Sequence, residues 1–290
     1  MRACESPART LGDLTADRAG KLIAADRERW ILATKLANPM GPGPNDRGLS
    51  RRHIMAAVDA SLRRLGTDFV DVLYLHREDA STPLEETLAA IATLIERGKV
   101  HHFGLSNFRA WRIARVAEMC RAMGMQPPVV CQPPYNAMSR QIETELLPCC
   151  DHYGVGVVSY SPLARGVLTG KYPPGQPPAE GTRAGSGDKR ILETEFREES
   201  LVIAQQIKAR CDAKGWVSGQ FAAAWVLANP VISSVIVGPR TLAHLEDVYG
   251  AVALVLDKED EAFINALVVP GHASSPGYND PAYPFFGRPV

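Results

Sequence analysis

The sequence predicts an α/β fold built on a parallel sheet, either open or closed into a barrel, and two observations carry this prediction. Short apolar runs alternate with amphipathic helical segments through the middle of the chain, which is typical of right-handed βαβ crossovers. The runs at 70–76 and 101–106 are apolar without polar alternation, as strands of a sheet covered on both faces require. At 290 residues the chain is long enough for one large core.

The stretch from Val70 to Phe108 is the most complete βαβ unit. Its helix is expected from Pro83 to Arg97, with Thr82 as a candidate cap and Gly98 following the last helical residue. Four apolar side chains of this helix form one stripe that would pack on the sheet: Leu84, Leu88, Ile91 and Ile95. Local signals therefore define both the ends and the buried face of this helix.

Polar residues gather where the two strands of this unit end. His76 follows the first strand, and Ser106 and Asn107 follow the second. In parallel α/β folds this edge of the sheet carries the chemistry. We therefore expect the functional site at the carboxyl ends of the strands.

The remaining elements are expected in regular alternation. The first strand, Trp30 to Thr34, is expected to be buried and to end at Lys35. Six strands are expected to begin near residues 30, 70, 101, 129, 156 and 233. Helices are expected over 15–26, 51–65 (with Ser50 as cap), 110–123, 142–153, 200–214, 218–229 and 257–267, and from Thr241. Residues 172–199 are a long polar loop, typical of a lid or binding loop, with disorder as the competing interpretation.

Composition excludes several classes of protein. The 32 basic and 32 acidic residues leave no net charge, and no basic block with interleaved aromatic residues suggests nucleic acid or an anionic membrane as a partner. No window of about 18 uninterrupted apolar residues is present, and the first 25 residues lack the apolar core of a signal peptide. These features favour a cytoplasmic protein. The six cysteines show no metal-binding spacing, so we expect buried thiols and no metal.

Several motifs taken together resemble one family. They are ATK ending at Lys35, GPGPNDRGLSRRHI from Gly41, LHRED around His76, TPLEETL, GKVHHFGLSNF, QPPYN from Gln132, YSPLARGVLTGKY from Tyr160, and VGPRTLAHLED from Val237. Found in this order over residues 12–270, they resemble the aldo-keto reductases, NADPH-dependent oxidoreductases built on the TIM (β/α)8 barrel. The resemblance implies an unpatterned N-terminus over 1–11, a barrel over 12–270 and a tail over 271–290.

The resemblance implies reduction of a small-molecule carbonyl substrate, an aldehyde or a ketone. In the family a tyrosine is the general acid, a lysine lowers the pKa of that tyrosine, an aspartate pairs with the lysine, and a histidine orients the carbonyl. Lys35 matches the lysine and His76 matches the histidine. The chemistry is consistent, because a lysine beside a phenol favours the phenolate.

The resemblance also assigns residues to NADPH. The set matching the contacts of the nicotinamide amide is Ser106, Asn107 and Gln132, and Tyr160 matches the stacking aromatic residue. Those matching the phosphate loop are Ser161, Pro162, Leu163, Arg165 and Lys171, with Arg183 as a further contact. The positions matching the adenosine 2′-phosphate site are Gly238, Arg240 and His244, before and within a helix start that favours an anion. The family often has glutamine at His244 and asparagine at Val248, which would alter adenine binding.

One departure from the family pattern concerns the acid. The family's tyrosine and aspartate follow its second strand, whereas the first tyrosine here is Tyr74. The resemblance therefore implies a barrel lacking its first two strands, an N-terminally truncated member with impaired or no activity. Tyr74 would lie deeper than His76 on the same strand, and Tyr135 belongs to a structural motif of the family, so neither is a good replacement.

Two expectations follow from such a chain. The alternative to an impaired enzyme is a redox-inactive nicotinamide-binding or interaction protein of the same fold, as the family's potassium-channel β subunits partly are. Strands near Ile31 and Val235 would each leave one edge of backbone groups unpaired, which favours self-association.

Overall fold

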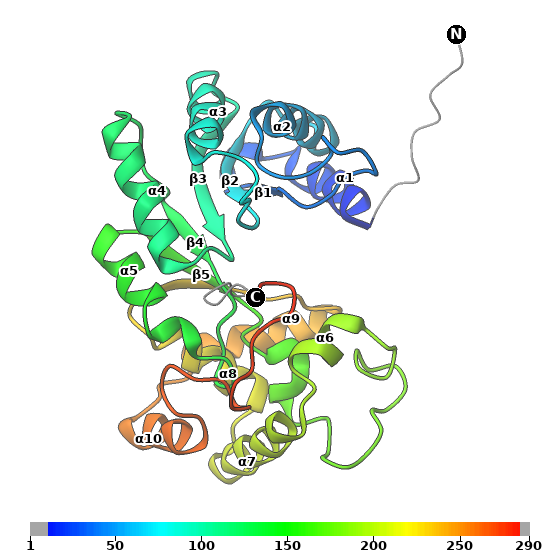
Figure 1. The fold of residues 1–290 in the computed structure, drawn as a ribbon. Coiled ribbons are helices and arrows are strands. Elements are labelled where there is room, and N and C mark those ends of the chain that lie inside the picture. Colours follow the sequence, from blue (N-terminus) through cyan, green and yellow to red (C-terminus); the bar gives the residue numbers. More distant parts are fainter. Residues whose placement is uncertain (1–10, 285–290) are drawn as a thin grey trace. The chain divides into compact units, whose positions relative to one another are not determined.

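The computed structural model describes residues 11–284, in which strands and helices alternate along the chain (Figure 1). The strands are β1 (Ala33–Leu36), β2 (Val70–Leu75), β3 (Val100–Ser106), β4 (Val130–Gln132), β5 (Gly156–Tyr160) and β6 (Ile232–Ile236). The α-helices are α1 (Leu11–Ile23), α2 (Arg51–Leu65), α3 (Leu84–Glu96), α4 (Ala110–Ala122), α5 (Leu146–Tyr153), α6 (Lys189–Thr194), α7 (Glu198–Lys214), α8 (Ser218–Leu227), α9 (Leu242–Tyr249) and α10 (Lys258–Leu267). Short 3-10 helices are η1 (Arg27–Arg29), η2 (Gln141–Glu143), η3 (Ala164–Thr169) and η4 (Gly250–Ala253).

These elements form two compact units, one ending at Val130 and one beginning at Cys131, so the division falls within β4. In the first unit β1, β2 and β3 pair in parallel in sequence order. In the second unit β5 and β6 pair in parallel. The described strands follow the order β1-β2-β3-β4-β5-β6, and hydrogen bonds do not close them into a ring. The predicted parallel α/β fold with six strands is confirmed.

The first unit is held together by apolar helix faces that the sequence pattern predicts. Helix α2 begins at the Ser50 cap, whose side chain accepts a hydrogen bond from the backbone N–H of His53. It buries the predicted face of Ile54, Val58, Leu62 and Leu65. Helix α1 lies so close to α2 that a Cβ on Gly20 would stand 2.3 Å from the carbonyl oxygen of Leu65. Only glycine fits at this contact.

Strand β1 differs from the expectation of a buried strand over Trp30 to Thr34. Pairing with β2 begins only at Ala33, and among the four residues of β1 only Leu36 is buried. In place of strand pairing, side chains form hydrogen bonds with the backbone of Trp30 and Leu32. Arg27 donates to the carbonyl oxygen of Trp30, and the N–H of Leu32 donates to the Asp71 carboxylate. Trp30 and Ile31 are consequently exposed rather than core residues.

The expected Thr82 cap of α3 is also wrong. The helix starts at Leu84 after Pro83, and no side chain caps it. The Thr82 hydroxyl donates to Asp79 instead, at 2.8 Å. The same carboxylate accepts from the backbone N–H groups of Leu49 and Ser81, so it ties the loop before α2 to the turn after β2. A charged acceptor attracts the hydroxyl more strongly than a helix N–H does.

Other boundaries shift by a few residues. Helix α1 begins four residues before the expected position, and the expected helix over 142–153 is divided into η2 and α5. At the break, Glu145 has an extended φ of −137°. Helix α8 is buried on nearly every side, as predicted.

The loop over 172–199 is anchored in the second unit. Tyr172 is buried, and its phenol oxygen accepts a hydrogen bond from the N–H of Ala184. The ring of Phe196 packs edge-on against Tyr172, and α6 lies within the loop. These contacts favour an ordered loop over disorder.

The described part of the tail, residues 271–284, also packs on the second unit. The N–H of Arg140 donates to the His272 carbonyl, and Arg197 donates to the side chains of Ser274 and Ser275. Farther along, Asp280 forms a two-point ion pair with Arg190 of α6. The tail is therefore fixed to the same helix that lies in the 172–199 loop.

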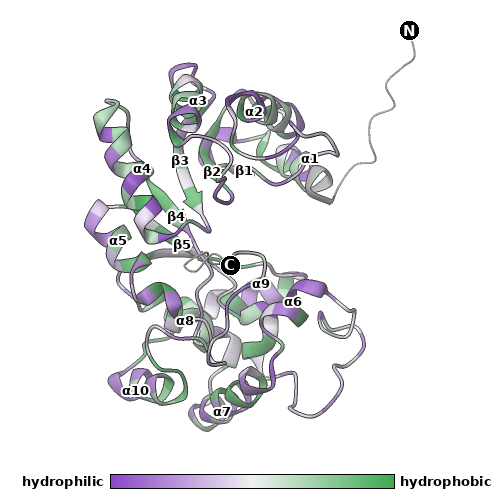
Figure 2. Ribbon diagram, viewed as in Figure 1, coloured by the Kyte–Doolittle hydropathy of each residue, from purple (hydrophilic) through white to green (hydrophobic). Residues whose placement is uncertain are grey.

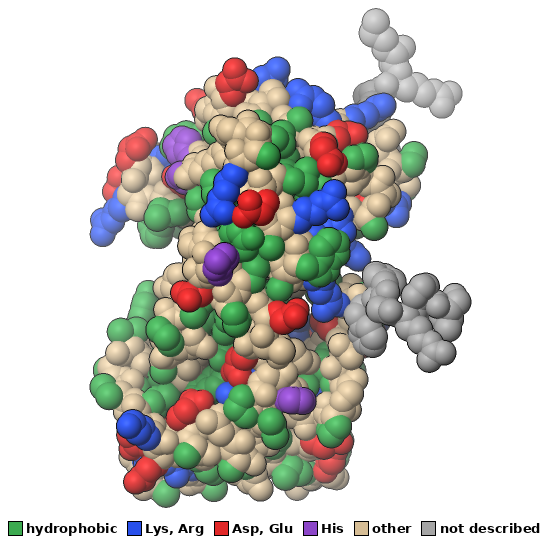
Figure 3. Space-filling model, turned by 60° about the vertical axis from the view of Figure 1, so that its left-hand side comes forward, with side chains coloured by type: hydrophobic (Ala, Val, Ile, Leu, Met, Phe, Trp, Pro, Cys, Tyr) green, Lys and Arg blue, Asp and Glu red, His purple; other side chains and the backbone are tan. Residues whose placement is uncertain are grey.

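The surface carries mixed charge. Figure 2 shows hydrophobic and hydrophilic segments alternating along the helices, and Figure 3 shows basic and acidic side chains interspersed on the visible face. None of the helices in residues 11–284 combines the length and apolarity needed to cross a bilayer. Within the same residues, the histidine, cysteine and acidic side chains form no group of three that could hold a metal ion.

Candidate functional site

In the first unit, the strand register places Lys35 beside Tyr74. The two residues are Cα partners in the β1–β2 pair, and the Lys35 ammonium lies 5.5 Å from the centre of the Tyr74 ring. Although much of the Lys35 side chain is exposed, reduced hydration of the ammonium lowers its pKa from the ordinary value. Lys35 thus stands at the carboxyl end of its strand, as expected.

His76 follows β2 directly and is fixed through its backbone and its ring. Its N–H donates to the Leu36 carbonyl at 2.9 Å, and its carbonyl accepts from the Asn107 side chain at 2.9 Å. The ring Nδ1 lies 3.1 Å from Nδ2 of Asn38. Partial burial, with the positive charges of Lys35 and Arg77, lowers the pKa of His76 to about 4. The imidazole is therefore neutral at physiological pH.

Ser106 and Asn107 join this group at the end of β3. Ser106 is buried, and its hydroxyl oxygen accepts from the Asn107 amide at 3.0 Å. Asn107 adopts a left-handed φ of 58°, a conformation that costs energy and that is often found at functional sites. Through the bond from Asn107 to the His76 carbonyl, the structure brings Lys35, His76, Ser106 and Asn107 into one connected cluster.

Tyr74 lies buried beneath this cluster. A Cβ on Gly104 of β3 would stand 2.9 Å from the Tyr74 ring, so glycine gives the ring its space. Tyr74 is 5 % exposed. Its burial agrees with the expectation that it lies deeper than His76.

In the second unit, Gln132, Tyr160 and Ser161 stand at the ends of β4 and β5. Gln132 is buried, and Tyr160 is half-buried. Burial raises the pKa of the Tyr160 phenol, which keeps it neutral. Ser161 has a left-handed φ of 59°, and its carbonyl accepts from the Asn136 side chain at 3.0 Å. The strand end is therefore followed by a fixed, strained turn.

The expected phosphate loop continues this turn. Pro162 is buried, Leu163 packs against α8, and Ala164, Arg165 and Gly166 have positive φ values of 46°, 54° and 96°. A right-handed residue followed by a left-handed one, as at Leu163 (φ −89°) and Ala164, forms a concave backbone turn that suits anions. A Cβ on Gly166 would stand 3.0 Å from the Lys171 ammonium, so this cation lies against the turn.

The two arginines expected at the phosphate site, Arg165 and Arg183, are both bound to side chains of this unit. Arg165 donates from Nε to the Thr194 hydroxyl at 3.2 Å, which links the turn to α6. Arg183 forms an ion pair with Asp188 at 2.9 Å, and that aspartate caps α6. Arg183 therefore helps to hold the start of α6, in addition to the phosphate contact expected of it.

The expected 2′-phosphate residues lie at the start of α9. Thr241 caps this helix by accepting from the N–H of His244, and Gly238 and Arg240 precede the cap on an exposed segment. A guanidinium and a helix N-terminus on one exposed segment suit a phosphate group. Ser161, Lys171 and Arg240 of the second unit are donors of the kind that could hold phosphate groups.

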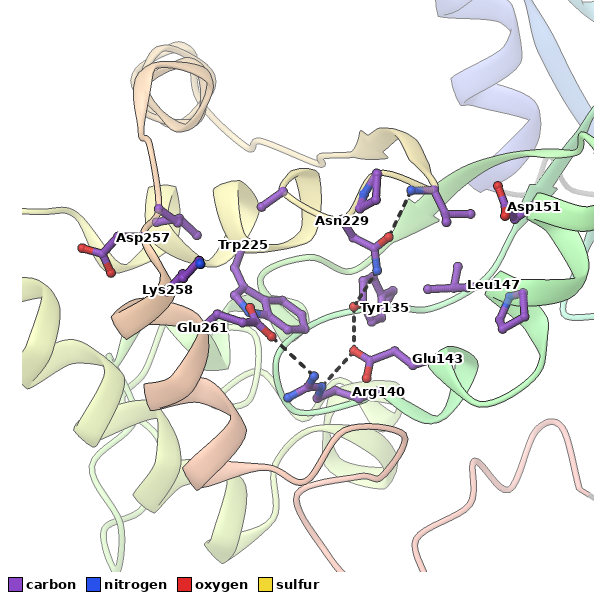
Figure 4. Close-up of a pocket in the computed structure, with 15 residues that line it drawn as sticks. Tyr135, Arg140, Glu143, Leu147, Asp151, Trp225, Asn229, Asp257, Lys258 and Glu261 are labelled. Carbon is purple, nitrogen blue, oxygen red and sulfur yellow. Dashed lines mark hydrogen bonds and ion pairs between the residues drawn. The ribbon is translucent and has the colours of Figure 1, made fainter.

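A pocket of about 750 Å³ in the second unit involves none of the expected site residues (Figure 4). Four of its lining residues are joined by hydrogen bonds. The Tyr135 phenol donates to Glu143 at 2.7 Å and accepts from Asn229, and buried Arg140 donates to Glu143 at 2.8 Å. Burial, with the hydrogen bond to Glu143, raises the pKa of Tyr135. Tyr135 is therefore a structural residue and a poor proton donor.

Sequence reasoning missed Asn38 as a neighbour of His76. Asn38 lies three residues after Lys35, in the ANPMG stretch of a loop that carries no periodic signal. The sequence signal that could have found it is an amide residue within a few residues of a predicted strand end. Its partner, however, is 38 residues away.

Comparison with known proteins gives a family match. The sequence model of the "Aldo/keto reductase family" matches residues 14–269. The "Probable voltage-gated potassium channel subunit beta" of Arabidopsis thaliana is 39% identical over 243 residues, which cover 81% of this chain and 74% of the relative. The "Uncharacterized oxidoreductase YrpG" of Bacillus subtilis (strain 168) is 36% identical over 264 residues, or 88% of this chain and 77% of the relative.

A further relative has a named substrate. The "L-glyceraldehyde 3-phosphate reductase" of Escherichia coli (strain K12) is 33% identical over 227 residues, covering 78% of this chain and 65% of the relative. The chain therefore spans about two thirds to three quarters of the length of these relatives.

Proposed function

The chain belongs to the aldo/keto reductase family, and on that basis we propose that it is an NADPH-dependent oxidoreductase that reduces aldehydes or ketones to alcohols. The observation that carries the proposal is the connected cluster of Lys35, His76, Ser106 and Asn107 at the carboxyl ends of β1, β2 and β3. In parallel α/β folds, catalytic groups stand at this edge.

His76 would orient the carbonyl. A neutral imidazole donates a hydrogen bond to the carbonyl oxygen without placing a full positive charge there, and its low pKa keeps it neutral across the physiological range. As the reduction proceeds, negative charge develops on this oxygen, and a fixed donor stabilises it. Bound NADPH would supply the hydride.

The cofactor would be held by the residues that match the family's NADPH contacts. Ser106 and Asn107 of the first unit, and Gln132 of the second, offer donors and acceptors suited to the nicotinamide amide. In the second unit, Tyr160 offers a half-buried ring for stacking, and the left-handed turn after Ser161 offers backbone to phosphate. Arg240 supports a preference for the 2′-phosphate of NADPH.

The proton source limits the activity that we propose. Lys35 could lower the pKa of a nearby phenol, which is the role of its counterpart in the family. Tyr74 is buried beside Lys35, and the Tyr135 hydroxyl is bound to Glu143, so neither is placed as the acid. Loss of a positioned acid costs about 10²- to 10⁴-fold in rate. With neither phenol placed as the acid, we expect slow or no reduction of carbonyls.

Two measurements test this proposal. NADPH binding is followed by quenching of intrinsic tryptophan fluorescence, and reduction of aromatic aldehydes or quinones is followed by loss of NADPH absorbance. A chimera carrying the first two strands of a relative, with its tyrosine and aspartate, should gain turnover. Changing that tyrosine to phenylalanine should abolish turnover and leave NADPH binding intact. A folded chimera that binds no NADPH would refute the proposal.

The second candidate is a redox-inactive nicotinamide-binding or interaction protein. It is favoured by the similarity to a relative named as a probable potassium channel β subunit. Under this alternative, the chimera binds NADPH yet shows no turnover with any carbonyl tested. The same two measurements therefore separate the candidates.

A further inference from the structure

We propose that Asn38 is a positioning residue for His76: its side-chain amide donates to Nδ1 and holds the imidazole as the tautomer with the proton on Nε2. The inference rests on the proposed function, in which His76 donates a hydrogen bond to the carbonyl oxygen.

The hydrogen bond itself fixes the tautomer. Nδ2 of Asn38 lies 3.1 Å from Nδ1 of His76. An amide nitrogen only donates, so Nδ1 must accept with its lone pair. In a neutral imidazole the remaining proton is then on Nε2, which is free to face a substrate.

His76 differs in this respect from three other histidines. Their Nδ1 atoms face acceptor oxygens, which require the proton on Nδ1. These pairs are His53 with the Asn45 carbonyl at 3.1 Å, His102 with Gln126 Oε1 at 3.2 Å, and His272 with the Pro270 carbonyl at 3.0 Å. Among the histidines with a hydrogen-bonded Nδ1 in residues 11–284, the structure therefore assigns the Nε2–H form to His76 alone.

The loop that carries Asn38 is built to hold it in place. Ala37 is buried and has a left-handed φ of 111°, a strained conformation for a residue with a side chain. Its carbonyl accepts from the N–H of Gly48 at 2.8 Å, and the next residue, Leu49, donates to Asp79 at 2.7 Å. These anchors offset the strain and fix the direction of the chain at Asn38.

The tautomer decides whether His76 can act on a carbonyl. With the proton on Nε2, the ring donates to the oxygen that gains negative charge. With the proton on Nδ1, the Nε2 lone pair would face that oxygen and repel it. The charged groups facing His76 are Lys35 and Arg77, which, together with partial burial, keep the ring neutral, so the tautomer is the remaining variable.

Nitrogen NMR of protein labelled with 15N-histidine tests the inference without any turnover. In the wild type, the His76 signals, assigned by their loss in His76→Gln, should show an unprotonated Nδ1 and a protonated Nε2. Asn38→Asp replaces the donor with an acceptor, so it should move the proton to Nδ1 and raise the pKa of His76. Asn38→Ala should leave a mixture of tautomers. Gln126→Ala is the matched control, because it removes the partner of His102 and should leave His76 unchanged.

Activity gives a second readout in the chimera described above. Asn38→Asp should lower kcat about 10²-fold, as for loss of one donor to a developing oxyanion, with NADPH affinity unchanged. Circular dichroism and thermal melting check that each variant is folded. A wild-type His76 with its proton on Nδ1, or an Asn38→Ala variant with an unaltered tautomer, would overturn the inference. Absence of turnover in the chimera would count against the proposed function and leave the NMR result decisive for Asn38.

Discussion

Asp79 gives a prediction whose size can be worked from the structure. Its carboxylate accepts from the N–H of Leu49, the N–H and hydroxyl of Ser81, and the hydroxyl of Thr82. Burial alone would raise its pKa, but the hydrogen bonds from Ser81, Leu49 and Thr82 lower it from 3.8 to about 2. The carboxylate form is thus bound tightly in the folded state.

The lowered pKa translates into stability at neutral pH. A pKa of about 2 instead of 3.8 corresponds to about 2 kcal/mol, which solvent screening of this partly exposed group reduces to about 1 kcal/mol. Asp79→Asn also turns an NH2 group toward backbone N–H donors, which costs about 1 kcal/mol more. We expect a total loss of about 2 kcal/mol in the free energy of unfolding.

The sign of the pH dependence follows from the direction of the shift. Because the pKa in the folded state is depressed, the ionic contribution is present above about pH 4 and is lost as the pH falls through about 2. The stability difference between wild type and Asp79→Asn should therefore shrink by about 1 kcal/mol between about pH 6 and about pH 2.

Urea unfolding followed by circular dichroism at several pH values measures this difference. Asp46→Asn is the control, because Asp46 lies in the loop before α2 that Asp79 binds, and its carboxylate accepts one backbone N–H, that of Gly43. A stability difference for Asp79→Asn that stays constant from neutral to acid pH would refute the reasoning, since it would show that the carboxylate charge contributes nothing.

Three further predictions concern the cofactor, the second unit and the sheet edges. Arg240→Ala should weaken NADPH by about 1 to 3 kcal/mol and leave NADH almost unchanged in fluorescence titrations, and equal affinities of the wild type for both cofactors would remove the argument. The buried Asp260 carboxylate pairs with the partly exposed Arg210 and Lys214, so Asp260→Asn should cost about 3 kcal/mol in urea unfolding. Asp257→Asn at the exposed helix cap should cost less than about 0.5 kcal/mol, because asparagine caps a helix as well as aspartate does. The strand edges near Ile31 and Val235 should make the chain self-associate in light scattering, and a monodisperse, cooperatively melting monomer would contradict this.

The sequence by itself determined the alternation of strands and helices and the apolar faces of the helices. Helix α2 illustrates this, because its cap at Ser50 and its buried face depend on residues within one segment. The residues at the strand ends, Lys35, His76, Ser106 and Asn107, could likewise be predicted, because strand ends and family motifs are both local in sequence.

Tertiary structure alone decided the features in which distant polar groups compete for the backbone. Thr82 turns from the helix to Asp79, and Arg27 and Asp71 bind the backbone that was expected to start β1. The pairing of Asn38 with His76 has the same origin, since it joins a strained loop to a strand end 38 residues later. Periodicity and propensity describe neighbours along the chain, whereas a hydrogen bond between distant residues depends on where the fold places both partners.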